Sequence, residues 1–129
     1  MKILWIATKA PWPPVDGGRR VLLDTLHALG AAGHRLTLVA PVAMAESERR
    51  SCEQELAAVC EPRLVAARPR PRWLDGLRAQ LRGMPWTVVR HALPAVRREV
   101  ETQLGQQRFD AVIAEQLQAL AAAEPAAER

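Results

Sequence analysis

The sequence predicts an α/β fold, in which a parallel sheet of about four strands is covered by helices. Short apolar runs alternate along the chain with segments whose apolar residues recur at three- and four-residue spacing. The first strand, helix and second strand fit within residues 2–40, which is typical of a right-handed βαβ unit with parallel strands. The chain has 129 residues, the size of one small domain.

The first unit begins with residues 2–8, KILWIAT, a continuous apolar run that predicts a strand buried on both faces. Residues 9–20 follow as a loop, because prolines at 11, 13 and 14 exclude a helix or a central strand. Gly17 and Gly18 are expected to close this loop. Residues 19–32 then predict an amphipathic helix, which ends where Gly30 or Gly33 adopts a left-handed conformation.

The second unit begins with residues 35–40, RLTLVA, a predicted strand that Pro41 is expected to stop. Ser47 is the predicted N-cap of a helix over residues 49–60. The residues of this helix expected to face inward are Leu56, Val59 and Cys60.

The third strand is predicted at residues 63–67, followed by a stiff basic linker, RPRPR, at residues 68–72. A short helix over residues 73–81 and a turn at residues 83–86 complete this stretch.

The last part contains apolar positions at helical spacing over residues 88–104, interrupted by Pro94, which predicts a break or a new helix with Pro94 in its first turn. Residues 109–114, FDAVIA, predict a fourth buried strand, and the tail over residues 121–129 is expected to fray. The common strand order 3-2-1-4 leaves residues 109–114 at an edge. An apolar strand is a poor bare edge, so we expect either a fold that continues beyond this chain or a partner that covers the edge.

Basic residues are concentrated in one stretch of a chain whose net charge is +4. Between Arg63 and Arg98 there are nine arginines and one acid, Asp75, and tryptophans are interleaved with them. Three interpretations stay open: a membrane surface or anionic acceptor, a nucleic acid, or a solvated helix face rich in arginine through codon usage. The first apolar run is too short for a secretory signal, which favours a cytoplasmic protein.

The cysteines and histidines do not have metal-ligand spacing. Cys52 and Cys60 are predicted to be reduced thiols in the core, because eight positions along one helix are too far apart for a disulfide. No metal or cofactor is expected.

The loop PPVDGG lies where open parallel sheets bind ligands, beyond the carboxyl end of a strand. Its glycines would allow a phosphate to approach the backbone amides at the start of the next helix, and arginines follow directly. The motif is neither GxGxxG nor a Walker loop, which disfavours a dinucleotide or a nucleotide-hydrolysing site. The alternative is a turn that needs glycine only for its backbone geometry.

The opening of the chain, KILWIATKAPWPPVDGGRRVLLDTLHALGAAGHRLTLVAP, resembles that of GT-B glycosyltransferases of the family 4 type. An apolar strand, a proline-rich loop ending in Gly-Gly, an arginine-bearing helix and the pair Gly33 and His34 occur in the family's order. The later segment FDAVIAEQLQAL is similar to the fourth strand and following loop of these enzymes.

The resemblance implies a Rossmann-like three-layer αβα domain with residues of two loops in the active-site cleft. Near the donor diphosphate and acceptor it places Asp16, Gly17, Gly18 and Arg19. On the acceptor side it places Glu115 and Gln116, although many relatives carry histidines around this strand.

The activity that the resemblance implies is transfer of a sugar from a nucleotide-sugar donor to an acceptor hydroxyl, with retention and without a metal. The acceptor would be a glycan or a lipid-linked molecule at the inner membrane, in bacterial polysaccharide or glycoconjugate synthesis. Such enzymes have two Rossmann-like domains, so residues 1–129 are expected to form a partial N-terminal domain, inactive without the nucleotide-sugar-binding domain. The alternative is a non-catalytic Rossmann-like module that binds an anionic ligand or a partner chain rather than nucleic acid.

Overall fold

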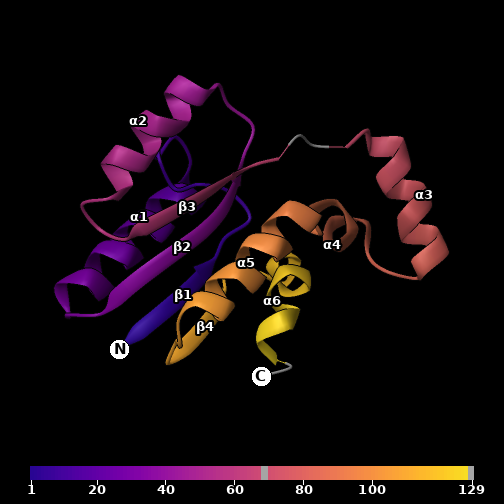
Figure 1. Ribbon diagram of the computed structural model, residues 1–129. Helices are drawn as coiled ribbons and strands as arrows, with labels where there is room; N and C mark the ends of the chain where they lie inside the picture. The colour runs from indigo at the N-terminus through magenta and orange to yellow at the C-terminus, as the bar shows by residue number, and fades with distance from the viewer. Residues whose placement is uncertain (68–69, 128–129) are drawn as a thin grey trace.

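A computed structural model describes residues 1–67 and 70–127 as a four-stranded parallel sheet flanked by helices, in the strand order β3-β2-β1-β4 (Figure 1). The strands are β1 (Lys2–Ile6), β2 (Arg35–Val42), β3 (Glu61–Ala66) and β4 (Ala111–Ala114). The predicted α/β class, the parallel pairing and the position of β4 at an edge are therefore confirmed.

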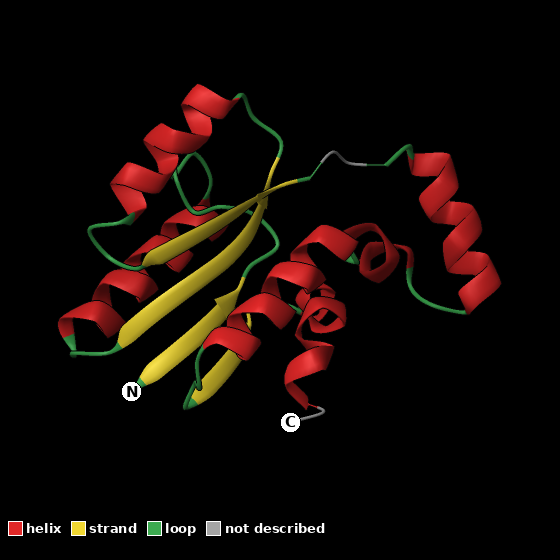
Figure 2. Cartoon of the chain, viewed as in Figure 1, coloured by secondary structure: helices red, strands yellow, loops and turns green. Residues whose placement is uncertain are grey.

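Helices cover both faces of this sheet (Figure 2). They are α1 (Gly17–Ala31), α2 (Glu46–Leu56), α3 (Arg72–Arg82), α4 (Trp86–His91), α5 (Pro94–Gln106) and α6 (Leu120–Ala127), with a 3-10 turn, η1 (Leu117–Ala119), before the last helix. Helices α1 and α2 pack on one face, and α5 and α6 pack on the other, which gives the three layers of a Rossmann-like fold.

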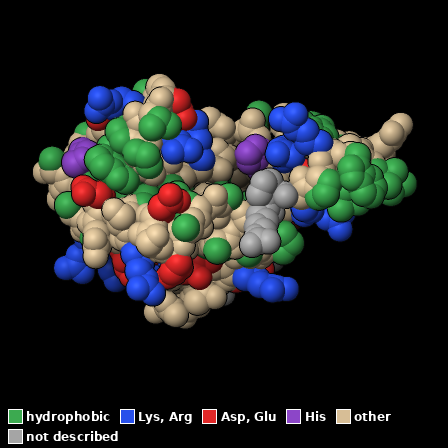
Figure 3. All heavy atoms as spheres, turned by 90° about the horizontal axis from the view of Figure 1, so that it is seen from above, with side chains coloured by type: hydrophobic (Ala, Val, Ile, Leu, Met, Phe, Trp, Pro, Cys, Tyr) green, Lys and Arg blue, Asp and Glu red, His purple; other side chains and the backbone are tan. Residues whose placement is uncertain are grey.

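Helix α3 differs from the others because it stands away from the sheet and contacts mainly α4 (Figure 1). In the space-filling view from above, hydrophobic side chains gather at this projecting end of the molecule (Figure 3). The described helices include none that is both long and apolar enough to cross a membrane.

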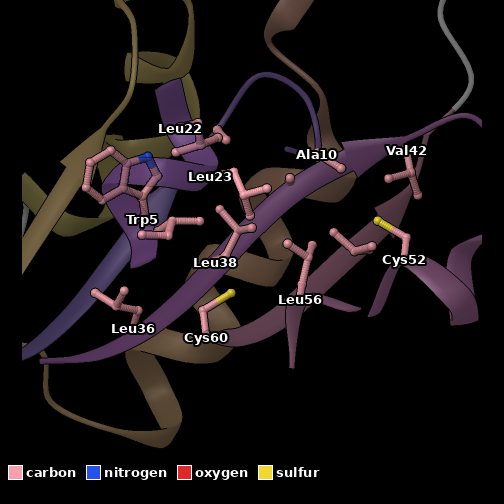
Figure 4. Packing of buried hydrophobic residues seen from close by; sticks show 14 of the residues in the cluster. Trp5, Ala10, Leu22, Leu23, Leu36, Leu38, Val42, Cys52, Leu56 and Cys60 are labelled. Atoms are coloured by element: carbon pink, nitrogen blue, oxygen red, sulfur yellow. The ribbon is translucent and has the colours of Figure 1, made fainter. Parts of the chain in front are cut away.

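Side chains of β1 alternate between two hydrophobic cores, because successive residues of a strand point to opposite faces. Ile3 and Trp5 join the core beneath α1 and α2. Figure 4 shows Trp5 among the side chains of this core. Leu4 and Ile6 join the core beneath α5 and α6, where Val100 is also fully buried. The prediction of a first strand buried on both faces is confirmed.

Pro41 does not stop β2, contrary to the sequence-based expectation. The strand continues to Val42, and Pro41 lies opposite Val65 of β3. Since β1 pairs with β2 only as far as Val39, no neighbouring strand requires an N–H group from Pro41 on that side.

Helix α2 begins earlier than predicted, with Ala45 rather than Ser47 at its N-cap. The backbone N–H of Ala45 donates to Glu48 Oε2 over 3.3 Å, and Glu46 and Glu48 both lie in the first turn. Carboxylates there are favoured by the helix dipole, which explains the earlier start. The helix ends at Leu56, before Cys60, although Cys60 remains buried.

Two expectations concern the end of the chain. The break at Pro94 is confirmed, since Pro94 is the first residue of α5.

The prediction of a frayed tail is wrong for the residues of α6, where Ala122 and Pro125 are buried and Arg97 Nη1 donates to Glu124 Oε2 over 2.5 Å. Small alanine side chains let α6 pack closely on α5. Residues 68–69 of the predicted linker and residues 128–129 of the tail lie outside the described residues.

Candidate ligand site at the carboxyl ends of β1 and β4

The carboxyl ends of β1 and β4 lie side by side, because the two strands pair in parallel. After β1 the chain passes through α1, on one face of the sheet, to β2, which is one neighbour of β1. Helix α5, on the other face, leads into β4, which is the other neighbour of β1. Ligands of open parallel sheets bind at such a reversal of strand order. The segments that follow β1 and β4 contain all the residues predicted for the site.

Asp16 caps α1 and is fully engaged with its neighbours. Its Oδ1 accepts hydrogen bonds from the backbone N–H of Arg19 over 2.9 Å and from Lys9 Nζ over 2.8 Å. The bond from Lys9, followed by that from the Arg19 N–H, lowers the pKa of the Asp16 carboxyl below its usual value. Asp16 therefore orients the start of α1 and holds Lys9 beside it.

The sequence predicted that Gly17 and Gly18 close the loop before the helix. In the structure they are instead the first two residues of α1. In the described part of the chain positive φ occurs only at Gly33 and Gly83, so the backbone conformation at 17 and 18 does not require glycine. A Cβ at Gly18 would lie 3.3 Å from Asp16 Oδ1 and 3.4 Å from Lys9 Nζ, whereas a Cβ at Gly17 would meet nothing within 4 Å. A Cβ at Gly18 would thus be tight only against the ends of two flexible side chains, and Gly17 leaves open space at the first turn of the helix.

Arg19 lies against the same loop. Its Nη1 donates to the carbonyl of Pro13 over 3.4 Å, and its Nε lies 3.3 Å from Asp16 Oδ2. This buried Nε makes no hydrogen bond within the described residues, but its ion pair with Asp16 gives it a partner and offsets its charge.

Glu115 follows β4 and reaches the same place from the other side. Its backbone N–H donates to the carbonyl of Ile6 over 2.9 Å, which joins the two strand ends. Within residues 1–67 and 70–127, its buried Oε2 has no hydrogen-bond partner. Burial raises the pKa of Glu115, while Lys9 and the Thr8 backbone act in the opposite direction.

Gln116 is exposed and precedes η1, whose first turn it closes by accepting from the Ala119 N–H over 2.8 Å. Its side chain makes no hydrogen bond within the described residues. The structure thus brings Glu115 beside the Asp16–Lys9 pair, with Gln116 next to it at the surface.

Lys9 was not predicted as a site residue, yet it connects the two segments. Its Nζ donates a hydrogen bond to Asp16 Oδ1, and its charge opposes the rise that burial causes in the pKa of Glu115. Its position directly beyond a buried strand, in a chain with only one other lysine, was the available signal.

The histidines lie elsewhere. His27 is exposed on α1, and His34 Nδ1 lies 3.5 Å from the amino terminus, at the opposite end of the sheet. His91 is half-buried at the end of α4, where burial and then Arg90 lower its pKa. None of the three joins the candidate site.

Both cysteines are buried free thiols in the core beneath α1 and α2, which confirms the prediction for them. Burial raises the pKa of Cys60 to about 12, and Cys52 Sγ donates to the Trp12 carbonyl over 3.3 Å. The part of the chain that the structure describes has no group of three or more His, Cys, Asp or Glu side chains placed to hold a metal ion.

Comparisons with protein-family models, with curated proteins and with solved structures find no match to this chain.

Proposed function

We propose that the chain forms the N-terminal, acceptor-side part of a GT-B glycosyltransferase, which transfers a sugar from a nucleotide-sugar donor to an acceptor hydroxyl with retention. One observation carries the proposal. The Gly-Gly segment and the segment after β4, which the sequence resemblance assigns to one cleft, meet at the reversal of strand order.

The start of α1 is suited to the donor diphosphate. Gly17 leaves open space at the first turn of α1, where the positive end of the helix dipole lies. Lys9 and Arg19 add positive charge there, and Asp16 pairs with both. In the proposed reaction these groups stabilise the negative charge that develops on the leaving diphosphate. Asp16 and Lys9 position the helix start and make no direct contact with the donor.

Glu115 is suited to the acceptor. Its unpartnered Oε2 accepts a hydrogen bond from an acceptor hydroxyl in this proposal, and exposed Gln116 offers a further donor and acceptor. The donor's nucleotide and most of its sugar contacts are assigned to a second domain of the enzyme, working in the cytoplasm.

A second candidate, a non-catalytic module completed by a partner chain, is favoured by the free edge of β4. Beside it lies an apolar groove of about 1260 Å³, with Leu93, Phe109, Val112 and Leu117 in its lining. A polypeptide that pairs with β4 would cover this groove.

The test is calorimetric titration of the chain with uridine diphosphate, a uridine diphosphate sugar and inorganic pyrophosphate. We expect binding that Arg19→Gln weakens about tenfold, as for loss of one charge-assisted hydrogen bond, and that Gly18→Val abolishes. Matched controls are Arg35→Gln, at the other end of the sheet, and Gly105→Ala, where a Cβ would meet nothing within 4 Å.

Stronger binding of the sugar nucleotide than of pyrophosphate supports the transferase. Equal binding of all three probes supports an anion-binding module instead. Absence of binding at millimolar concentration, or equal losses in the control variants, contradicts the assignment of a ligand site to the carboxyl ends of β1 and β4.

A further inference from the structure

Helix α3 turns an apolar stripe away from the rest of the molecule. Trp73, Leu77 and Leu81 recur every four residues and therefore lie on one face of the helix, with exposed fractions of 71%, 51% and 79%. Met84 and Trp86, which follow the helix, are also exposed. Figure 3 shows hydrophobic side chains gathered at the projecting end of the molecule.

The opposite face of α3 is held by charge rather than by a large apolar contact. Asp75 is fully buried and accepts from Arg70 Nε over 2.9 Å and from Arg90 Nη1 over 3.2 Å. Arg70 Nη2 also donates to the carbonyl of Val89 over 2.7 Å, which ties the helix to α4. The only acid between positions 63 and 98 is thus turned inward and neutralised.

The outward charge of α3 is consequently all positive. Arg72, Arg78 and Arg82 are exposed, and no ion pair involves them within the described residues. Arg78 is next to the stripe on the helix surface, whereas Arg72 and Arg82 are at the two ends of the helix, about 100° of rotation from the nearest residue of the stripe. Long arginine side chains can reach a layer of anions from such positions.

We propose that α3 binds the surface of an anionic lipid membrane, with Trp73, Leu77 and Leu81 below the headgroups and the three arginines at the lipid phosphates. The combination of an apolar face, a tryptophan and flanking arginines is that of helices that lie in the membrane interface. This inference does not depend on the proposed transfer reaction.

The charge around the stripe favours an anionic lipid surface. The three apolar side chains expose about 400 Å² together on ordinary side-chain areas, and the charged side chains exposed on the same helix are all arginines. A lipid surface accepts such a narrow stripe without needing a complementary shape. Helix α3 lies beyond the carboxyl end of β3 (Figure 1), so binding would bring that edge of the sheet toward the membrane.

The test is flotation of the full chain with vesicles of phosphatidylcholine alone and of phosphatidylcholine with phosphatidylglycerol. We expect binding to the anionic vesicles only, accompanied by quenching of tryptophan fluorescence by brominated lipid, which Trp73→Phe largely removes. The double variant Leu77→Ser with Leu81→Ser should weaken binding at least about tenfold for each leucine. The control changes Val21, an exposed apolar residue of α1, to serine.

The charge test compares two variants of equal net charge. Arg78→Gln with Arg82→Gln should weaken binding roughly 30-fold, from about fivefold for each arginine near the surface. Arg20→Gln with Arg35→Gln removes the same charge from exposed positions on α1 and β2 and should have little effect. Circular dichroism verifies that each variant is folded.

Three results would overturn the proposal: no binding to anionic vesicles, equal losses in test and control variants, or equal binding to neutral vesicles. A dimer in sedimentation analysis that the Leu77 and Leu81 changes dissociate would also overturn it, because a second copy would then cover the stripe.

Discussion

Helices α1 and α3 have similar sequence patterns and opposite surroundings. Both carry leucines at helical spacing, but Leu22 and Leu26 of α1 are buried against the sheet, whereas Leu77 and Leu81 of α3 are exposed. Helix α1 is the crossover between two adjacent strands, so the topology presses its apolar face onto them. Helix α3 lies outside the layers. An amphipathic pattern therefore predicts which side of a helix is apolar, but it does not predict what covers that side.

The two helices also begin differently. The side chain of Asp16 caps α1, whereas α3 follows Pro71 without a side-chain cap. The cap fixes the start of α1 near the end of β1. The position of α3 depends instead on the ion pairs of buried Asp75 with Arg70 and Arg90.

The largest expected difference is between core and stripe leucines. Leu26→Ala should lower the free energy of unfolding by about 3 kcal/mol, since it leaves a cavity in a packed core. Leu81→Ala should change it by less than about 0.5 kcal/mol. Urea unfolding followed by circular dichroism measures both, and similar losses would show that α3 is covered.

Removal of the ion pairs of Asp75 should affect α3 alone. Asp75→Ala leaves two partly buried guanidinium groups without their acceptor, which should cost about 2 kcal/mol in the local opening of α3. Native-state hydrogen exchange of the α3 amides measures this opening. Asp24→Ala, at an exposed position of α1, is the control and should leave all amides unchanged. Unchanged exchange in α3 after Asp75→Ala would contradict its attachment by charge.

The left-handed residue after α1 should have a smaller effect. Gly33 has a φ of 84°, so Gly33→Ala should cost about 1 kcal/mol of global stability through backbone strain. In contrast, Gly105→Ala in the last turn of α5 should add about 0.5 kcal/mol, because alanine has a higher helix propensity than glycine and its Cβ meets nothing there. Equal effects of the two substitutions in urea unfolding would refute the assigned role of Gly33.

The smallest effect concerns Glu115 and depends on pH. Burial raises the pKa of Glu115 above its usual value, so the folded state favours the protonated carboxyl. The stability that this protonated form contributes is lost as the pH rises through the raised pKa. Glu115→Gln should match the wild type at pH 4 and be more stable than it at pH 8. Thermal unfolding at the two pH values measures the difference. A variant that is less stable at pH 8 would indicate that the ionised carboxylate stabilises the fold through Lys9.

Much of the fold could be predicted because it depends on local patterns. Apolar runs such as that of β1 and the spacing of Leu22 and Leu26 predicted the strands and the first crossover. The strand order followed from the common arrangement of such sheets. The continuation of β2 through Pro41 depends on where β1 ends, which the sequence of β2 does not reveal. Helix α6 is held in place by packing on α5, which the sequence of the tail does not reveal either.

The candidate site was predictable in part. The Gly-Gly segment was visible as a motif, and the structure placed Glu115 beside it. Lys9 was missed because its role arises only when the end of β1 and the cap of α1 come together in space. The inward orientation of Asp75 was likewise invisible, since its partners lie at positions 70 and 90.

The most direct test of the central claim is a titration of the ¹⁵N-labelled chain with uridine diphosphate, followed by NMR. If the two loops form one site, the amides of Gly17, Gly18 and Arg19 and those of Glu115 and Gln116 will shift along a single saturation curve. Shifts confined to one segment, or curves with different midpoints, would contradict a shared site at the carboxyl ends of β1 and β4.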